Sequence, residues 1–179
     1  CVALDTAEEL QRYTYDVAGC VGEFWTELAF LVLRSPARES RDQMMEWGRN
    51  YGQALQLVNI LRDVPEDLDK GRCYLPGVDP MDREGLVAAA EQWHATCREW
   101  LRDGVRYAEA LRGIRMRFAS GLPGLLGAQT LDLLAQADWA RWKGGVKVTR
   151  KDVKRSMALA FAKSAWFLPG SWKLGTERD

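Results

Sequence analysis

Four polar side chains recur at helical spacing in an otherwise apolar stretch, and they are the residues best suited to chemistry. They are Gln56, Asn59, Asp63 and Asp67, separated by 3, 4 and 4 positions. On an α-helix, where each residue turns about 100° from the last, all four fall on one stripe. A surface helix normally carries an apolar stripe on a polar body, and this helix has the reverse. We therefore expect the stripe, which Gly52 extends by one turn, to line an internal cavity.

The pair Asp63 and Asp67 predicts a divalent cation. Carboxylates at i and i+4 lie about 6 Å apart, and two like charges in a poorly solvated cavity are costly unless a cation compensates them. Oxygen ligands without histidine or cysteine favour Mg²⁺ over zinc. Mg²⁺ held by one or two carboxylates commonly completes its shell with water and substrate phosphates, which Asn59, Gln56 and Arg62 could also contact. An isolated D-x-x-x-D pair is more often a solvated surface feature, but the apolar helix around this pair argues against that alternative.

Composition narrows the function classes. The chain has 179 residues, is 47% hydrophobic, and carries 25 basic and 25 acidic side chains, so its net charge is zero. It can bury a core, and the balanced charge argues against nucleic-acid binding. Its four cysteines form no C-x-x-C pair and it has one histidine, His94, which argues against zinc fingers and disulfide scaffolds. No segment is long and apolar enough to span a membrane, and free cysteines favour the cytoplasm.

Helical periodicity runs through the chain, and alternating strand patterns are absent, so we predict one all-α domain over residues 1–179. The first helix should have Asp5 or Thr6 as its N-cap, with the side chain of Glu8 or Glu9 reaching back to it. Pro65 should kink the second helix near its end, and a loop should follow at residues 73–80. The expected helices cover about residues 4–33, 40–69, 82–110, 125–142 and 149–166, the fourth preceded by a break at Gly121–Gly124.

Two longer motifs contain these residues. Residues 56–67 read QLVNILRDVPED and are followed by GRCYLP at 71–76, while residues 13–22 read YTYDVAGCVG. The first resembles the second aspartate-rich motif of the squalene/phytoene synthases. The second resembles that family's other signature, a tyrosine followed by Val-Ala-Gly-x-Val-Gly. The resemblance covers Tyr13 to Pro76, and beyond it only the helical pattern matches.

The resemblance implies an isoprenoid synthase helical bundle and a reaction. Members of this family join two prenyl diphosphates head-to-head through a cyclopropyl diphosphate intermediate, using Mg²⁺. The metal ligands would be Asp63, Asp67 and Asn59. The catalytic residues would be Arg62 and Tyr13, the latter beside the developing carbocation or the departing diphosphate. The substrate-binding residues would be Val17, Ala18, Gly19, Val21, Gly22, Gln56, Asn59 and Arg72.

Several of these positions have simpler explanations. Small residues such as Gly19 and Gly22 can serve close helix packing as well as leave room for a prenyl chain. Lys147 might correspond to a late basic residue that contacts diphosphate in the family, but a solvated helix start is the favoured interpretation. The tryptophans have helical spacing and should be core residues; they include Trp93, Trp100, Trp139, Trp142 and Trp166.

The family's first aspartate-rich motif lies on an early helix, and no such helix precedes Tyr13 in this chain. We therefore expect the chain to be the C-terminal part of a larger domain, inactive by itself, with a non-catalytic helical scaffold as the alternative. Squalene is the product first expected, with NADPH as reductant, and phytoene or dehydrosqualene are the alternatives. The expected partners are prenyl diphosphates, without nucleic acid or a partner protein. An apolar product would favour peripheral association with a membrane.

Overall fold

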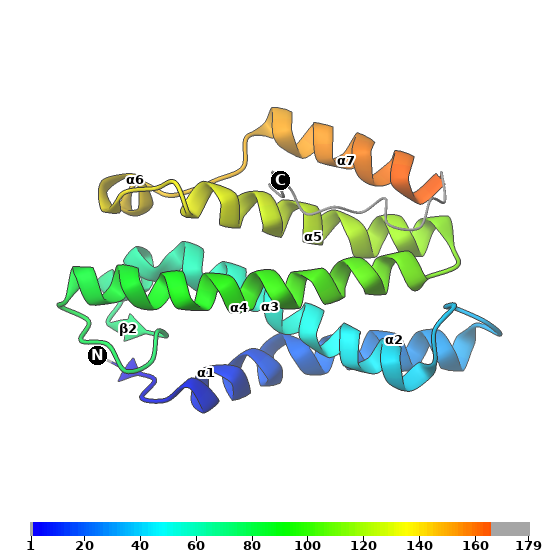
Figure 1. Ribbon diagram of the computed structural model, residues 1–179, viewed down its shortest axis with the longest axis horizontal. Helices are drawn as coiled ribbons and strands as arrows, with labels where there is room; N and C mark the ends of the chain where they lie inside the picture. The colour runs from blue at the N-terminus through cyan, green and yellow to red at the C-terminus, as the bar shows by residue number, and fades with distance from the viewer. Residues whose placement is uncertain (1, 166–179) are drawn as a thin grey trace.

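The structure, a computed structural model that describes residues 2–165, is a bundle of helices (Figure 1). The helices are α1 (Ala7–Thr14), the π-helical turn η1 (Tyr15–Gly19), α2 (Cys20–Val32), α3 (Arg41–Asp69), α4 (Arg83–Ala110), α5 (Ile114–Leu134), α6 (Trp139–Lys143) and α7 (Arg150–Ala165). Two short strands, β1 (Val2–Ala3) and β2 (Arg72–Cys73), pair in parallel. The all-α prediction is confirmed for this part of the chain. Trp166, where the last helix was expected to end, lies outside the described residues.

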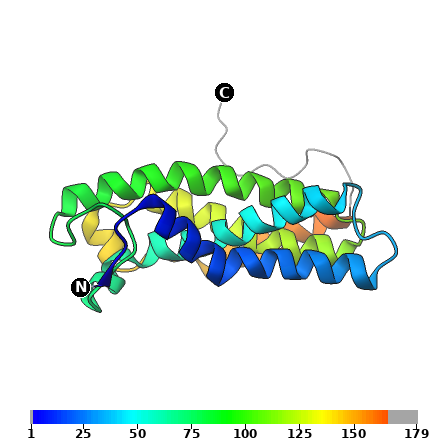
Figure 2. The ribbon, with the colours of Figure 1, turned by 90° about the horizontal axis from the view of Figure 1, so that it is seen from below.

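Helix α3 occupies the centre and provides more of the main core cluster than any other element. It packs against α2, α4 and α5, while α7 covers the far side of α5 (Figures 1 and 2). The apolar side of α3 is fully or almost fully buried at Leu57 and Leu61, where it meets side chains such as Leu101 and Leu131. The polar stripe of α3 therefore lies on the side that this core does not cover.

The first predicted helix begins as expected but is not a single α-helix. Thr6 is the N-cap, and its hydroxyl accepts from the backbone N–H of Glu9 while Glu9 accepts from the Thr6 N–H. After Thr14 the backbone makes the π-helical turn η1. A π turn holds one extra residue and changes which side chains face a neighbouring helix. The Val-Ala-Gly part of the motif thus lies entirely within this irregular turn.

Helices α2 and α3 approach closely enough for their backbones to touch. A Cβ atom placed on Gly22 would lie 2.0 Å from the carbonyl oxygen of Gly48, and one on Gly52 would lie 2.2 Å from that of Ala18. Only glycine fits at either position, because the opposing atoms are backbone and cannot turn away. This contact fixes the tyrosine motif against the helix that carries the aspartates.

The expected break before residue 125 is wrong. Gly121–Gly124 lies inside α5, which starts earlier, at Ile114, and tolerates Pro123 in its interior. Proline removes the hydrogen bond to the carbonyl four residues earlier, here that of Ala119. Both Pro123 and Ala119 are exposed, so solvent can satisfy that carbonyl. The expected fourth helix also ends sooner: α5 stops at Leu134, and α6 is a separate short helix.

Candidate functional site

The polar stripe of α3 is open to solvent in the described part of the protein, so the expected internal cavity is not found there. Asn59 is exposed, whereas Gln56 and Asp67 are half-buried and the Asp63 side chain is 35% exposed. Gly52, at the start of the stripe, packs against Ala18. Apolar side chains of α3 border the stripe on both sides, but the other elements within residues 2–165 do not enclose it.

Asp63 forms an ion pair with its sequence neighbour. The Arg62 guanidinium donates to both carboxylate oxygens, Nε to Oδ1 at 2.7 Å and Nη2 to Oδ2 at 2.7 Å. The hydrogen bond to Asp63 raises the pKa of Arg62 further, so the guanidinium stays charged. This bidentate geometry is the one by which arginine also binds phosphate groups. A cation could therefore replace Arg62 as the partner of Asp63, and a phosphate group could replace Asp63 as the partner of Arg62.

Asp67 lies in a second group, together with Tyr13, Arg72 and Tyr74. The rings of Tyr13 and Tyr74 stack with their centroids 5.0 Å apart. Burial, the Tyr74 hydroxyl and the Asp67 carboxylate all raise the pKa of Tyr13, against a smaller opposing effect of Arg72. The tyrosine motif of α1 and the end of the aspartate motif thus meet in space, although Tyr13 and Asp67 are 54 positions apart in the sequence.

The two aspartates are electrostatically linked. Burial and then the negative charge of Asp63 raise the pKa of Asp67 above its ordinary value. Two carboxylates that repel each other on one helix face are a suitable donor set for a hard divalent cation such as Mg²⁺. No cluster of three or more histidine, cysteine, aspartate or glutamate side chains close enough to bind a metal is found within residues 2–165. Any Mg²⁺ here would need further oxygen ligands from water, diphosphate or other residues.

Basic side chains face Asp63 across a hollow of about 300 Å³ between α3 and the segment after α6. Lys143 and Lys147 line it, and the Lys143 Nζ lies 3.8 Å from the Asp69 Oδ1. Lys147 was favoured as a solvated helix start; it is exposed, but it lies on the same hollow as Asp63. Sequence reasoning missed Lys143 and Tyr74. The signal for Tyr74 was its place in the GRCYLP motif, and Lys143 gave none.

The remaining motif residues divide into buried and exposed ones. Gly19 is buried, and Ala18 and Gly22 contact α3, as the packing explanation required. Val17 and Val21 are each 44% exposed and continue into the exposed apolar side chains of α2, Phe24 and Trp25. Their expected contact with a prenyl chain stays a prediction, as does the role of every site residue named from the motifs. None of the described helices is long and apolar enough to cross a bilayer.

Asp67→Asn should stabilise the metal-free protein at pH 7 by up to about 1 kcal/mol, the scale of exposed charge pairs. Because the pKa of Asp67 is raised by folding, the folded state binds its proton more tightly than the unfolded chain does. The contribution of Asp67 to the free energy of unfolding should therefore fall as pH rises from the ordinary pKa, about 3.9, through the raised value, so the wild type should lose stability relative to the variant over this range. Urea unfolding from pH 3 to pH 7 measures this, and the advantage of the variant should vanish near pH 3. Asp69→Asn, on the same turn but exposed, should show no such gain; a destabilised Asp67→Asn at pH 7 would contradict the prediction.

The sequence profile of the family described as squalene/phytoene synthase matches residues 2–152. The chain is 45% identical over 75 residues to a phytoene synthase of Thermus thermophilus, covering 42% of this chain and 23% of that protein. It is 29% identical over 158 residues to a 15-cis-phytoene synthase of Enterobacter agglomerans, covering 81% of this chain and 46% of that one. The chain thus spans less than half the length of these curated relatives.

The fold has a counterpart among solved structures. A structure of TcSQS with the ligand BPH1237 superposes with a TM-score of 0.76 at 22% sequence identity, covering 89% of this chain and 50% of that chain. TcSQS is a squalene synthase, so the likeness confirms the isoprenoid synthase fold expected from the sequence. At this level of identity it speaks to the fold alone.

Proposed function

The chain belongs to the squalene/phytoene synthase family, and from this premise we propose that the protein condenses two prenyl diphosphates head-to-head in a Mg²⁺-dependent reaction. The observation that carries the proposal is the meeting of the two motifs at the end of α3. Asp63 with Arg62, and Asp67 with Tyr13, Tyr74 and Arg72, place acidic, basic and phenolic groups on neighbouring turns.

Asp63 and Asp67 would hold Mg²⁺, with Asn59 beside them on the same stripe. The donor set fits, because it consists of hard oxygens and because the two carboxylates repel each other without a cation. When bound, the metal would neutralise the diphosphate leaving group and so ease its departure.

Arg62 and Tyr13 would act on the same leaving group. Arg62 is charged and can donate a pair of parallel hydrogen bonds to phosphate oxygens when Asp63 is taken up by the metal. The raised pKa of Tyr13 keeps its phenol protonated at neutral pH, so its hydroxyl can donate to a diphosphate oxygen. The exposed Arg72, close to Tyr13 and Asp67, adds a second positive charge for the diphosphate.

The prenyl chain needs an apolar and dry surface, because water would quench the carbocation. Val17 and Val21 begin an apolar face on α2 next to the glycine contact with α3. Together with Gln56 at the border of the polar stripe, this face would hold the first part of the chain. Ala18, Gly19 and Gly22 would shape it indirectly, by setting how closely α2 approaches α3.

The product is proposed to be of the phytoene type. The relatives named above are phytoene synthases, which supports this class over the squalene expected from the sequence. Phytoene-type products keep the oxidation level of the intermediate and need no NADPH, whereas squalene formation does. An apolar product of either kind would be released most easily at a membrane surface, so peripheral association is part of the proposal.

Incubation of the complete protein with geranylgeranyl or farnesyl diphosphate and Mg²⁺ tests the function. We expect pyrophosphate release that requires Mg²⁺ and does not require NADPH, with a phytoene-type hydrocarbon as product. Formation of squalene that requires NADPH would support the alternative; pyrophosphate release alone does not separate the two, because the first pyrophosphate leaves when the cyclopropyl intermediate forms. No release from either substrate would refute the catalytic proposal and leave a helical scaffold as the function.

A further inference from the structure

Pro65 leaves a buried carbonyl of α3 without its usual partner. Proline has no N–H, so it cannot make the helical hydrogen bond to the carbonyl four residues earlier, which is that of Leu61. Helix α3 nevertheless continues to Asp69. Leu61 and Pro65 are both buried, so solvent does not satisfy this carbonyl in the way it can at the exposed Pro123. A buried carbonyl without a donor would be costly.

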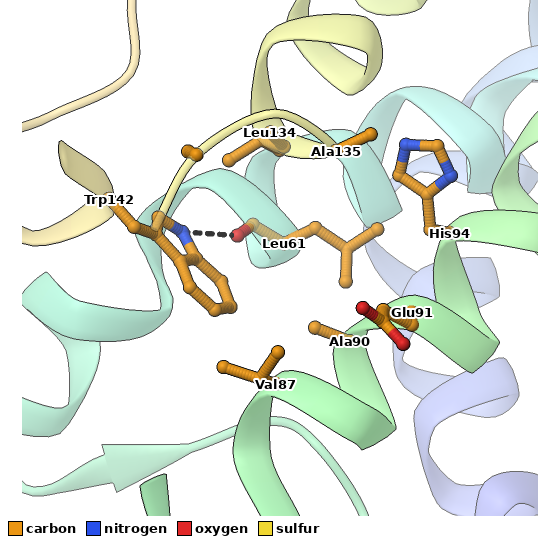
Figure 3. Close-up of a pocket in the computed structure, with 9 residues that line it drawn as sticks. Leu61, Val87, Ala90, Glu91, His94, Leu134, Ala135 and Trp142 are labelled. Carbon is orange, nitrogen blue, oxygen red and sulfur yellow. Dashed lines mark hydrogen bonds between the residues drawn. The ribbon is translucent and has the colours of Figure 1, made fainter. Parts of the chain in front are cut away.

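The donor comes from α6. The indole Nε1–H of Trp142 donates to the Leu61 carbonyl at 3.0 Å (Figure 3). It also donates to the Arg62 carbonyl at 3.1 Å. Trp142 is buried and packs edge-to-face on Trp139. Its indole therefore supplies the Leu61 carbonyl with the hydrogen bond that Pro65 cannot make, on the turn that carries Arg62 and Asp63.

The same contact fixes the basic segment that follows α6. Trp142 is followed at once by Lys143, and the chain then turns through Gly145, whose φ is 88°, to the buried Val146. Trp142 and Val146 are both buried, and each is followed directly by a lysine, Lys143 or Lys147, that lines the hollow beside Asp63. Movement at Trp142 would move both sides of this hollow relative to each other.

We propose that Trp142 is a positioning residue. It supplies the hydrogen bond missing at Pro65, and it thereby fixes the position of the Arg62–Asp63 turn relative to the Lys143–Lys147 segment for binding of Mg²⁺ and diphosphate. The hydrogen bond itself follows from the geometry alone. Its use in ligand binding rests on the proposed function.

A double-mutant cycle tests the replacement of the missing donor. Trp142→Phe keeps most of the packing but removes the N–H, and should lower the melting temperature of the complete protein by about 3–6 °C. Pro65→Ala restores a backbone donor for Leu61, so the loss caused by Trp142→Phe should be at most half as large in the Pro65→Ala background. Equal losses in both backgrounds would refute the replacement.

Binding of inorganic pyrophosphate in the presence of Mg²⁺, measured by titration calorimetry, tests the positioning. Trp142→Phe should weaken this binding about fivefold or more at a temperature where the variant is folded. Trp139→Phe is the control on the same helix: within residues 2–165 the Trp139 indole makes no hydrogen bond to α3, so this variant should bind like wild type. Unchanged binding by folded Trp142→Phe would overturn the positioning role. If wild-type protein does not bind Mg²⁺ and pyrophosphate, the proposed function and the positioning role both fail, while the stability cycle still decides the hydrogen bond.

The wild-type protein offers a test that needs no folded variant. The Trp142 indole proton, followed by ¹⁵N–¹H NMR, should exchange with solvent at least about tenfold more slowly than that of the half-buried Trp93. Addition of Mg²⁺ with pyrophosphate should shift its resonance. Rapid exchange would contradict the buried hydrogen bond, and an unmoved resonance at saturating ligand would contradict its coupling to the site.

Discussion

Asp63→Asn should lower pyrophosphate release from prenyl diphosphates by about a thousandfold, the upper scale for removing one group that stabilises developing charge. The substitution removes a negative ligand from the proposed Mg²⁺ site and also breaks the two-oxygen ion pair with Arg62. The measurement is the steady-state rate of pyrophosphate release at saturating Mg²⁺, with circular dichroism to verify that the variant is folded.

Asp42→Asn is the matched control for this substitution. Asp42 is an exposed carboxylate on the same helix, α3, in its first turn, about 30 Å from Asp63 along the helix axis. It should keep near wild-type activity, since it makes the same change of charge far from the proposed site. Unchanged turnover of Asp63→Asn would refute the metal assignment, and equal losses in both variants would indicate a general effect of charge.

Gly22→Ala should lower the free energy of unfolding by about 3 kcal/mol, at the upper end of the usual cost of overpacking. The new Cβ would lie 2.0 Å from the Gly48 carbonyl oxygen, and relief requires α2 and α3 to separate. Because this contact also fixes Tyr13 relative to the aspartates, the activity of the folded fraction should fall as well. Urea unfolding gives the first quantity, and turnover per folded molecule gives the second.

Gly127→Ala provides the opposite case in the same bundle. Gly127 is a helical glycine buried in α5, but a Cβ there would meet side chains of Val58, Leu101 and Leu55 at 3.5 Å or more, which is ordinary contact. Alanine favours helix over glycine by up to about 1 kcal/mol, so this variant should be neutral or more stable. If both substitutions had the same effect, the close approach of α2 and α3 would not be what makes Gly22 necessary.

The helical fold and the two motifs were predictable because both are local in sequence. The N-cap at Thr6, the long helix through Asp67 and the all-α class follow from residues within a few turns of one another. The break expected at Gly121–Gly124 failed because burial of Gly121 and Gly124 and exposure of Pro123 outweigh their low helix propensity. Whether a helix continues through such residues depends on which side of it faces the core.

The part of the site that could not be predicted is built from distant segments. The stack of Tyr13 on Tyr74 and the position of Lys143 beside α3 both depend on how helices pack. The enclosed cavity was inferred from an apolar helix body, which correctly places α3 at the centre of the bundle. The apolar pattern of α3 could not indicate which residues would cover the polar stripe, and residues 2–165 leave the stripe open.

The pairing of β1 with β2 has a consequence for the order of folding. Val2 pairs with Arg72 and Ala3 with Cys73, so the contact closes a loop of about 70 residues. The entropy cost of closing this loop is offset only after α3 has formed. Two-residue strands offer few hydrogen bonds in return. Helix–helix contacts such as those of α3 with α4 can form earlier, and the corner that joins Tyr13, Asp67, Arg72 and Tyr74 is then completed late. By the same reasoning, the pairing of β1 with β2 is among the first contacts to open in partial unfolding, so a ligand at the proposed diphosphate site would hold closed a corner that its own strands hold weakly.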